Sequence, residues 1–157
     1  MQGALDIRDP RLTLARGNPG KESIMAKIDE INPGQEFPPQ ANPVGKYQPI
    51  YYAGASGDFN PIHIDPEFGK MAGLGGNILQ GLCTMAFCAK AMTDLAGDPG
   101  RLKMLRVRFA KPVYPLDKVE VKGKVASKDG GRIEVELGAW TKNGETQVIS
   151  NAAAIIE

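Results

Sequence analysis

An aspartate and the only histidine of the sequence lie five residues apart, at Asp58 and His63. The stretch that holds them, residues 56–63, reads SGDFNPIH and suits neither a helix nor a strand, so we expect a rigid loop. A loop that fixes a carboxylate and an imidazole close together can hold a water or a substrate hydroxyl between an acid and a base. Both residues are therefore candidate catalytic groups, and the alternatives are a turn-forming aspartate and a structural histidine.

The clearest element after this loop is a helix between Ile78 and Leu95. Apolar residues cover most of its circumference, and beyond its start only Lys90 and Asp94 are strongly polar. A helix that is apolar nearly all round is buried on more than one side. The turn sequence GDPG at residues 97–100 ends it.

After this helix the apolar residues recur with a period of two. Apolar and charged side chains alternate in four predicted strands, at residues 103–111, 118–126, 132–140 and 145–156. The sequences Asp129-Gly130-Gly131 and Asn143-Gly144 indicate hairpin turns, and such short connections require antiparallel pairing. The sequence predicts an α+β domain, with a curved antiparallel β-sheet wrapped around one long central helix.

The segments around the candidate loop are expected to be short. Residues 31–44 carry several prolines and predict an irregular or edge-strand lead-in. Residues 48–55 predict a short helix with Pro49 in its first turn. Residues 65–71 predict a further helical turn that Asp65 caps.

The whole chain, at 157 residues, has the length of one domain with a real core. Residues 1–24 are rich in Arg, Asp, Gly and Pro and show no period, so we expect a poorly ordered extension. A single domain follows at residues 25–157, and Met25 is an alternative start.

The composition argues against several classes of protein. A formal net charge of +1 does not fit a nucleic-acid or membrane-surface protein, which usually has a strong basic excess. We find no signal-like opening segment and no apolar run that spans a bilayer. Cys83 and Cys88 are not spaced as CxxC, so we expect neither a disulfide nor a metal site. A reduced, cytoplasmic setting is the resulting prediction.

A family resemblance adds to these observations. Residues 52–65 (YAGASGDFNPIHID) resemble the hydratase motif of MaoC-like, hot-dog-fold (R)-specific enoyl-thioester hydratases and dehydratases. Residues 80–82 (QGL) fall where that family usually has His-Gly-Met, and residues 106–109 with 112–113 are similar to its single-domain bacterial members. The resemblance runs from about Ile28 to the end of the chain.

The resemblance implies a hydro-lyase that interconverts (3R)-hydroxyacyl and trans-2-enoyl thioesters of coenzyme A or acyl-carrier protein. Asp58 and His63 would transfer the protons, and which residue transfers which proton stays open. The enolate-like oxygen needs fixed donors, and Gly81 would offer its backbone N–H at a helix N-terminus. The alternative for Gly81 is close helix packing. Asn60 and Ser56 would support the site by orienting Asp58 or its loop.

Two departures from the family pattern affect this interpretation. Gln80 replaces the histidine before the glycine, and Ala89 falls where some hydratases carry a serine that helps to hold the site. Arg106, Arg108 and Lys111 have two interpretations: contacts to the phosphates of the substrate carrier, or a solvated strand face.

We expect no metal and no redox cofactor; coenzyme A or pantetheine enters as part of the substrate. One sheet around one helix leaves the other sheet face open, and hot-dog domains resemble one another in covering it by dimerisation. We therefore expect a homodimer or higher homo-oligomer, with a heterodimer as the alternative. The partners would then be an acyl-thioester substrate and another hot-dog subunit, with no nucleic acid and no membrane.

Two other functions fit the same fold. A hot-dog acyl-CoA thioesterase needs a carboxylate or nucleophile on the central helix, where only Thr84 and Asp94 are available. A non-catalytic acyl-thioester-binding subunit of a heterodimeric dehydratase predicts replaceable site residues, which the intact pair of Asp58 and His63 argues against.

Overall fold

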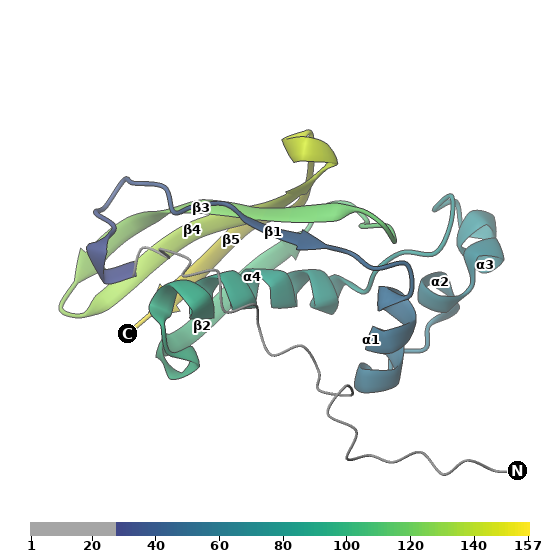
Figure 1. The fold of residues 1–157 in the computed structure, drawn as a ribbon, viewed down its shortest axis with the longest axis horizontal. Helices are drawn as coiled ribbons and strands as arrows, with labels where there is room; N and C mark the ends of the chain where they lie inside the picture. Colours follow the sequence, from purple (N-terminus) through teal and green to yellow (C-terminus); the bar gives the residue numbers. More distant parts are fainter. Residues whose placement is uncertain (1–27) are drawn as a thin grey trace, which may run out of the picture.

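The computed structural model describes residues 28–157 and arranges five strands in one antiparallel sheet. Across the sheet the strands are ordered β1-β3-β4-β5-β2, so β1 and β2 form its two edges (Figure 1). The bounds of the strands are β1 Gln40–Pro43, β2 Leu102–Phe109, β3 Lys118–Asp129, β4 Arg132–Thr141 and β5 Thr146–Ile156. The extension predicted at residues 1–24 and the alternative start at Met25 lie outside the described residues.

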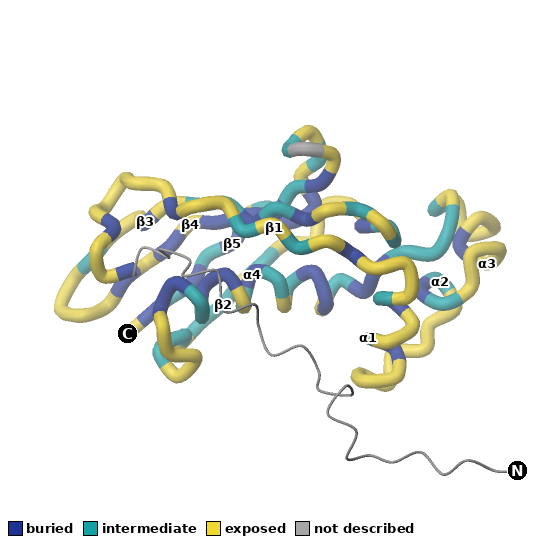
Figure 2. The backbone as a smooth tube through the Cα atoms, viewed as in Figure 1, coloured by how far each residue is buried: buried dark blue, intermediate teal, exposed yellow. Residues whose placement is uncertain are grey.

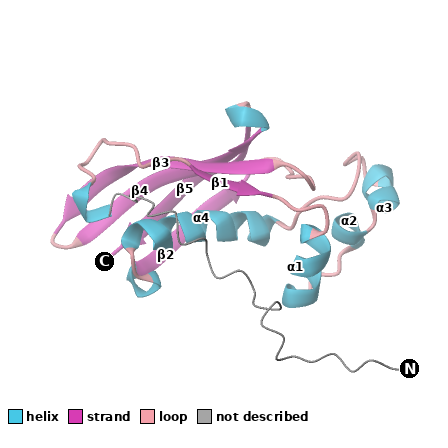
Figure 3. Ribbon diagram, in the orientation of Figure 1, coloured by secondary structure: helices cyan, strands magenta, loops and turns pink. Residues whose placement is uncertain are grey.

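One long helix, α4 (Gly81–Ala96), runs along one face of this sheet (Figure 1). The other helical segments are short: η2 Ile28–Glu30, α1 Gln48–Ser56, α2 Pro61–Ile64, α3 Pro66–Met71, η3 Pro99–Arg101 and η4 Lys142–Gly144. Figure 3 shows α1, α2 and α3 together beyond one end of the sheet, near the N-terminal end of α4. The predicted α+β architecture, a sheet around one long helix, is confirmed.

Local sequence signals explain the short helices. Pro49 lies in the first turn of α1, and Gly57 ends that helix with a φ of 78°. The Oδ1 atom of Asp65 accepts hydrogen bonds from the N–H groups of Glu67 (2.9 Å) and Phe68 (3.2 Å), and so caps α3. Both predicted helical segments are confirmed.

The predicted strands are confirmed with small changes at their ends. Strand β3 extends to Asp129, and Gly130 and Gly131 form the β3–β4 turn with φ values of 53° and 87°. The β4–β5 connection is the 3-10 turn η4 rather than a two-residue hairpin turn. All four strand pairs are antiparallel, as the short connections required.

The predicted start of the central helix was wrong by three residues. Ile78 and Leu79 precede α4, because their N–H groups donate to the carbonyls of Ile62 (3.0 Å) and Val113 (2.8 Å). Gln80 has an extended backbone with ψ at 136°, so helical hydrogen bonding begins only at Gly81. Contacts to remote segments therefore override the apolar pattern at this position.

The core lies between α4 and the sheet (Figure 2). Cys88, Met92 and Leu95 of α4 are at most 2% exposed, and they belong to the same buried cluster as sheet residues such as Val121 and Ile149. Leu82, on the same helix, has 60% of its surface exposed. The expectation that α4 is buried on more than one side is therefore not met within this single chain.

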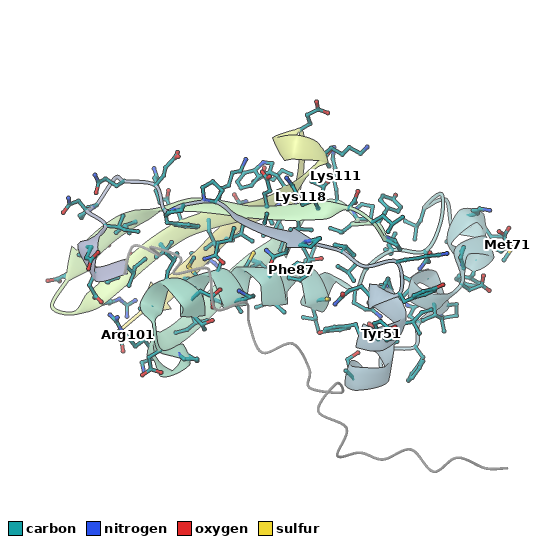
Figure 4. The ribbon with its side chains drawn as sticks, viewed as in Figure 1. Tyr51, Met71, Phe87, Arg101, Lys111 and Lys118 are labelled. Carbon is teal, nitrogen blue, oxygen red and sulfur yellow. The ribbon has the colours of Figure 1, made fainter. Side chains whose placement is uncertain are left out.

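A network around Arg101 closes the end of the domain opposite to α1–α3 (Figure 4). Its guanidinium donates to both carboxylate oxygens of Asp29 (2.8 and 2.9 Å), to the carbonyl of Ala96 (3.0 Å) and to the carbonyl of Glu157 (3.0 Å). The hydrogen bonds from Arg101 hold the pKa of the Asp29 carboxyl below its ordinary value. Arg101 thereby links η2, the end of α4 and the end of β5.

Candidate active site

Asp58 and His63 lie side by side, with Nε2 of His63 3.6 Å from Oδ2 of Asp58. The expectation of a loop throughout was wrong for the second half of the stretch, because His63 lies on the one-turn helix α2. Pro61 is tolerated in a first helical turn, and Oδ1 of Asn60 accepts the N–H of Ile62 at 3.2 Å as an N-cap.

The imidazole of His63 is oriented by the segment that leads into α4. Its Nδ1 atom lies 2.9 Å from the carbonyl oxygen of Ile78. Because a carbonyl only accepts, Nδ1 carries a proton, and in the neutral ring Nε2 is the bare nitrogen. The proton-exchanging nitrogen therefore faces Asp58. The side chain of His63 is 10% exposed, whereas the side chain of Asp58 is 46% exposed.

Asp58 is held from both sides by the predicted supporting residues. Ser56 Oγ donates to the carbonyl of Tyr52 (2.7 Å) and accepts the N–H of Asp58 (3.2 Å). The backbone N–H of Asn60 donates to Oδ1 of Asp58 at 3.3 Å. Oδ1 is thus restrained, while Oδ2 is directed at His63. Asn60 orients Asp58 through its backbone, since its side chain caps α2.

Gly81 is the first residue of α4 and shares a pocket with His63. Within the described residues, its N–H donates to no acceptor, as expected for the first N–H of a helix. A Cβ atom at this position would lie 3.3 Å from the ring of Phe109, so both predicted roles of the glycine, an accessible N–H and close packing, fit the geometry. The pocket has a volume of about 330 Å³ and is lined mainly by apolar groups, from His63, Leu74, Ile78, Leu79, Gly81, Thr84, Phe109, Ala110, Lys111, Pro112, Val113 and Val148.

Gln80 is the residue whose place in the site the sequence did not show. It is 1% exposed, and its Nε2 donates to the carbonyls of Pro49 (3.0 Å) and, more weakly, Asp58 (3.5 Å). Its Oε1 is buried without a hydrogen-bond partner among the described residues. The side chain connects the Asp58 backbone to the start of α4. The sequence signal for this role was the position of Gln80 directly before Gly81. From the sequence alone, Gln80 was recognised only as a departure from the family pattern.

The other predicted site residues are distributed unevenly. Thr84 lines the pocket, but its hydroxyl donates to the carbonyl of Gln80 (3.4 Å). Asp94 pairs with Lys90 and does not line this pocket, nor does Ala89. No carboxylate of α4 therefore faces the pocket, in contrast to what the thioesterase alternative requires.

The three basic residues that had two interpretations separate in the structure. Lys111 lines the pocket that contains His63. Arg106 and Arg108 line a different hollow on the sheet, together with Glu134 and Glu136. Only Lys111 is therefore placed to meet a ligand of the His63 pocket.

Cys83 and Cys88 are both free and buried. Burial raises the pKa of the Cys88 thiol to about 12 and also raises the pKa of Cys83. Neither thiol is suited to act as a nucleophile at neutral pH. In residues 28–157, no three His, Cys, Asp or Glu side chains are grouped to hold a metal, and no described helix is long and apolar enough to cross a membrane.

Sequence comparisons identify the family to which this chain is similar. A sequence model described as "MaoC like domain" matches residues 30–148. The Probable enoyl-CoA hydratase 2 of Dictyostelium discoideum is 42% identical over 113 residues, which cover 70% of this chain and 37% of that protein. The Peroxisomal multifunctional enzyme type 2 of Mus musculus is 45% identical over 101 residues, which cover 62% of this chain and 13% of that enzyme. The chain thus spans less than two fifths of either curated relative.

Solved structures show the same fold. A MaoC-like dehydratase superposes with a TM-score of 0.78 at 28% identity, over 85% of this chain and 42% of that chain. The unliganded R-hydratase PhaJ1 of Pseudomonas aeruginosa superposes with a TM-score of 0.72 at 24% identity, over 82% and 83% of the two chains.

Proposed function

The chain belongs to the MaoC-like domain family and has its hot-dog fold, and from this premise we propose that it is an (R)-specific hydro-lyase. It would interconvert (3R)-hydroxyacyl and trans-2-enoyl thioesters without a metal or redox cofactor. The observation that carries the proposal is the 3.6 Å approach of His63 Nε2 to Asp58 Oδ2, beside a pocket that His63 and Gly81 both line.

The proposed chemistry starts at the thioester carbonyl. The N–H of Gly81 would donate to this oxygen, where negative charge develops as the C2 proton leaves. The positive end of the α4 dipole acts in the same direction. Because Gly81 and His63 line one pocket, a carbonyl at Gly81 would bring the C2 and C3 atoms towards the acid–base pair.

The proton transfers would then use the two facing atoms. In dehydration, one group takes the C2 proton while the other protonates the C3 hydroxyl, which leaves as water. In hydration, the pair removes a proton from a water as its oxygen bonds to C3, and a proton is returned to C2. A separation of 3.6 Å exceeds a hydrogen bond, so both groups can contact one shared hydroxyl or water.

A hydratase fits this pocket better than a thioesterase does. The thioesterase alternative needs a carboxylate or an activated nucleophile on α4, and the pocket-facing Thr84 already donates its hydroxyl to Gln80. The similarity to the Probable enoyl-CoA hydratase 2 of Dictyostelium discoideum supports the same choice.

Assembly with a second hot-dog subunit is part of the proposal. Leu82 and Phe109 are 60% and 50% exposed, and the edge strand β2 pairs only with β5 among the described residues. A homodimer would cover these groups, and a heterodimer stays the alternative. One structural neighbour is the ChsH1-ChsH2 complex of Mycobacterium tuberculosis, which at 21% identity supports the fold alone. The cytoplasmic setting stays a prediction, because relatives include peroxisomal enzymes.

Loss of enoyl-thioester absorbance tests the proposed function. Crotonyl-CoA and a longer trans-2-enoyl-CoA would be offered to the wild type, Asp58→Asn and His63→Ala, with Asp94→Asn as a matched control outside the pocket. We expect turnover in the wild type and the control, and a loss of roughly a hundredfold or more in both site variants. Folded site variants with wild-type rates would refute the acid–base assignment. Chiral analysis of the hydration product checks the (3R) configuration.

A further inference from the structure

A second hollow adjoins the pocket of His63 and shares Lys111 and Pro112 with it. It lies between the segment after β2 and the η4 turn, and Figure 4 shows Lys111 near this end of the sheet. We call it the lysine hollow; its volume is about 270 Å³, and it is lined by Lys111, Pro112, Tyr114, Asp117, Thr141, Lys142 and Thr146.

The two lysines of the lysine hollow differ from the neighbouring lysines of the sheet. On β3, the amines of Lys118 and Lys122 both pair with Glu120, at 2.9 and 3.1 Å. In the described part of the chain, Lys111 and Lys142 form no ion pair with any carboxylate. The hollow therefore contains two ammonium groups without an ion-pair partner, and Asp117 is the one carboxylate in its lining.

The one carboxylate in the lining is already engaged. Oδ2 of Asp117 accepts the backbone N–H of Tyr114 at 2.8 Å, which restrains it within its own turn. The side-chain hydroxyls of Thr141 and Thr146 add groups that can donate to an anion. The lining thus carries a net positive charge and offers hydroxyl donors beside the ammonium groups.

The backbone of Lys142 is itself unusual. Its φ of 50° lies in the left-handed region, which costs free energy for a residue with a Cβ. Residues that keep such strain cluster at sites where the side chain has a function. A glycine would relieve the strain, but it would remove the second ammonium group from the hollow.

We propose that the lysine hollow binds the phosphate of the phosphopantetheine arm that carries the acyl group. This inference rests on the proposed function, because it takes the His63 pocket as the thioester site. The shared wall of Lys111 and Pro112 makes the hollow contiguous with that pocket, so the arm would extend from the thioester towards the two ammonium groups. Coenzyme A and acyl-carrier protein both present this phosphate.

Substrates with and without the phosphate test the proposal. Hydration kinetics would be compared for crotonyl-CoA, crotonyl-4′-phosphopantetheine and crotonyl-pantetheine, which has no phosphate. For Lys142→Ala, and separately for Lys111→Ala, we expect the KM of both phosphorylated substrates to rise about tenfold more than the KM of crotonyl-pantetheine. Lys124 lies on β3 and its amine pairs with Glu136 of β4, so Lys124→Ala is the matched control and should keep wild-type KM values.

Each outcome decides between sources of the anion. An equal rise with the two phosphorylated substrates supports the phosphate of the arm. A rise confined to crotonyl-CoA would assign the lysines to its nucleotide phosphates and overturn the proposal. Equal effects on all three substrates, or none, would also overturn it.

Binding without turnover separates this proposal from the proposed function. If the wild type hydrates none of the substrates, the hydratase proposal fails. Calorimetric titration with phosphopantetheine then tests the lysine hollow alone. About tenfold weaker binding to Lys142→Ala than to the wild type and Lys124→Ala would support the hollow, and equal binding would overturn it.

Discussion

The two ends of α4 differ in whether their terminal backbone groups have hydrogen-bond partners. At the C-terminal end, Gly97 donates its N–H to the carbonyl of Thr93, and Arg101 donates to the carbonyl of Ala96. At the N-terminal end, the N–H of Gly81 has no acceptor among the described residues, and Oε1 of the preceding Gln80 is buried without a partner. Unsatisfied polar groups reduce stability when they are buried, and the carbonyl of the proposed thioester substrate would supply the missing acceptor for the Gly81 N–H.

The largest expected effect comes from removing the free N–H of Gly81. Gly81→Pro deletes this donor at a helix position that tolerates proline, after the extended backbone of Gln80. Gly81→Ala is the matched control, because it also adds a Cβ beside Phe109 but keeps the N–H. We expect kcat of the proline variant to fall about a hundredfold below that of the alanine variant in the enoyl-CoA assay. Equal rates would show that the N–H does not stabilise the transition state.

A smaller effect is expected from the buried amide of Gln80. Gln80→Met keeps the approximate shape but removes the donor to Pro49 and Asp58, as well as the unpartnered Oε1. We expect kcat to fall about tenfold, because Asp58 loses a restraint. The free energy of unfolding, measured with a denaturant, should change by less than about 2 kcal/mol. Gln80→His, which restores a ring N–H donor, should recover part of the rate. A stability loss without a change in kcat would show a purely structural role.

The opposite end of α4 should affect stability rather than rate. Arg101→Leu removes the bonds to Ala96, Glu157 and Asp29, and we expect it to cost about 1–2 kcal/mol of unfolding free energy at pH 7. The ion pair contributes little of this, because the Asp29 side chain is 54% exposed. The kcat should stay within about twofold of the wild type; a large loss would mean that the two ends of the helix are coupled.

The difference in unfolding free energy between the wild type and Arg101→Leu should change with pH in a defined direction. Arg101 lowers the pKa of the Asp29 carboxyl below its ordinary value of 3.8. Stability from a lowered carboxyl pKa is complete above the ordinary value and is lost as the pH falls through the lower, folded-state value. The free energies of unfolding of the wild type and Arg101→Leu should therefore differ slightly less once the pH falls below the folded-state pKa of Asp29, and the part of the difference that comes from the bonds to the carbonyls of Ala96 and Glu157 should remain. A difference that grows on acidification would contradict the assignment.

The smallest effect is expected at Leu116, outside both ends of α4. This residue is 76% exposed and has a φ of 71°. Leu116→Gly removes the strain of the left-handed backbone conformation. We therefore expect the free energy of unfolding, measured by heat or denaturant, to rise by about 0.5–1 kcal/mol, with kcat unchanged. A loss of stability would show that the leucine side chain makes contacts in an assembled form, and that these contacts outweigh the backbone strain.

The elements with a clear period could be predicted from the sequence, and their junctions could not. Alternation fixed the type of β3 and β4 because each has one buried face. The apolar Ile78 and Leu79 continued the helical pattern, yet Ile62 and Val113 take up their N–H groups. These partners are remote in sequence, so no local pattern contains them.

The candidate site divides in the same way. The residue types of Asp58 and His63 indicated acid–base chemistry, and the family resemblance indicated which chemistry. The hydrogen bond from Gln80 to Asp58 joins residues far apart in the chain. Lys111 and Lys142 line the same hollow only because of the order of strands in the sheet. The roles of Asp58, His63, Gly81, Asn60 and Ser56 stay predictions until the variants are measured.

The hydrogen bond from Nδ1 of His63 to Ile78 also gives the protein a built-in spectroscopic reporter. His63 is the only histidine of the chain, so its ring nitrogens give the only imidazole ¹⁵N signals and need no assignment by mutation. A protonated Nδ1 and a bare Nε2 have widely separated chemical shifts, so the spectrum reads the tautomer directly. Adding a non-reactive thioester would then show, atom by atom, whether the ligand reaches Nε2.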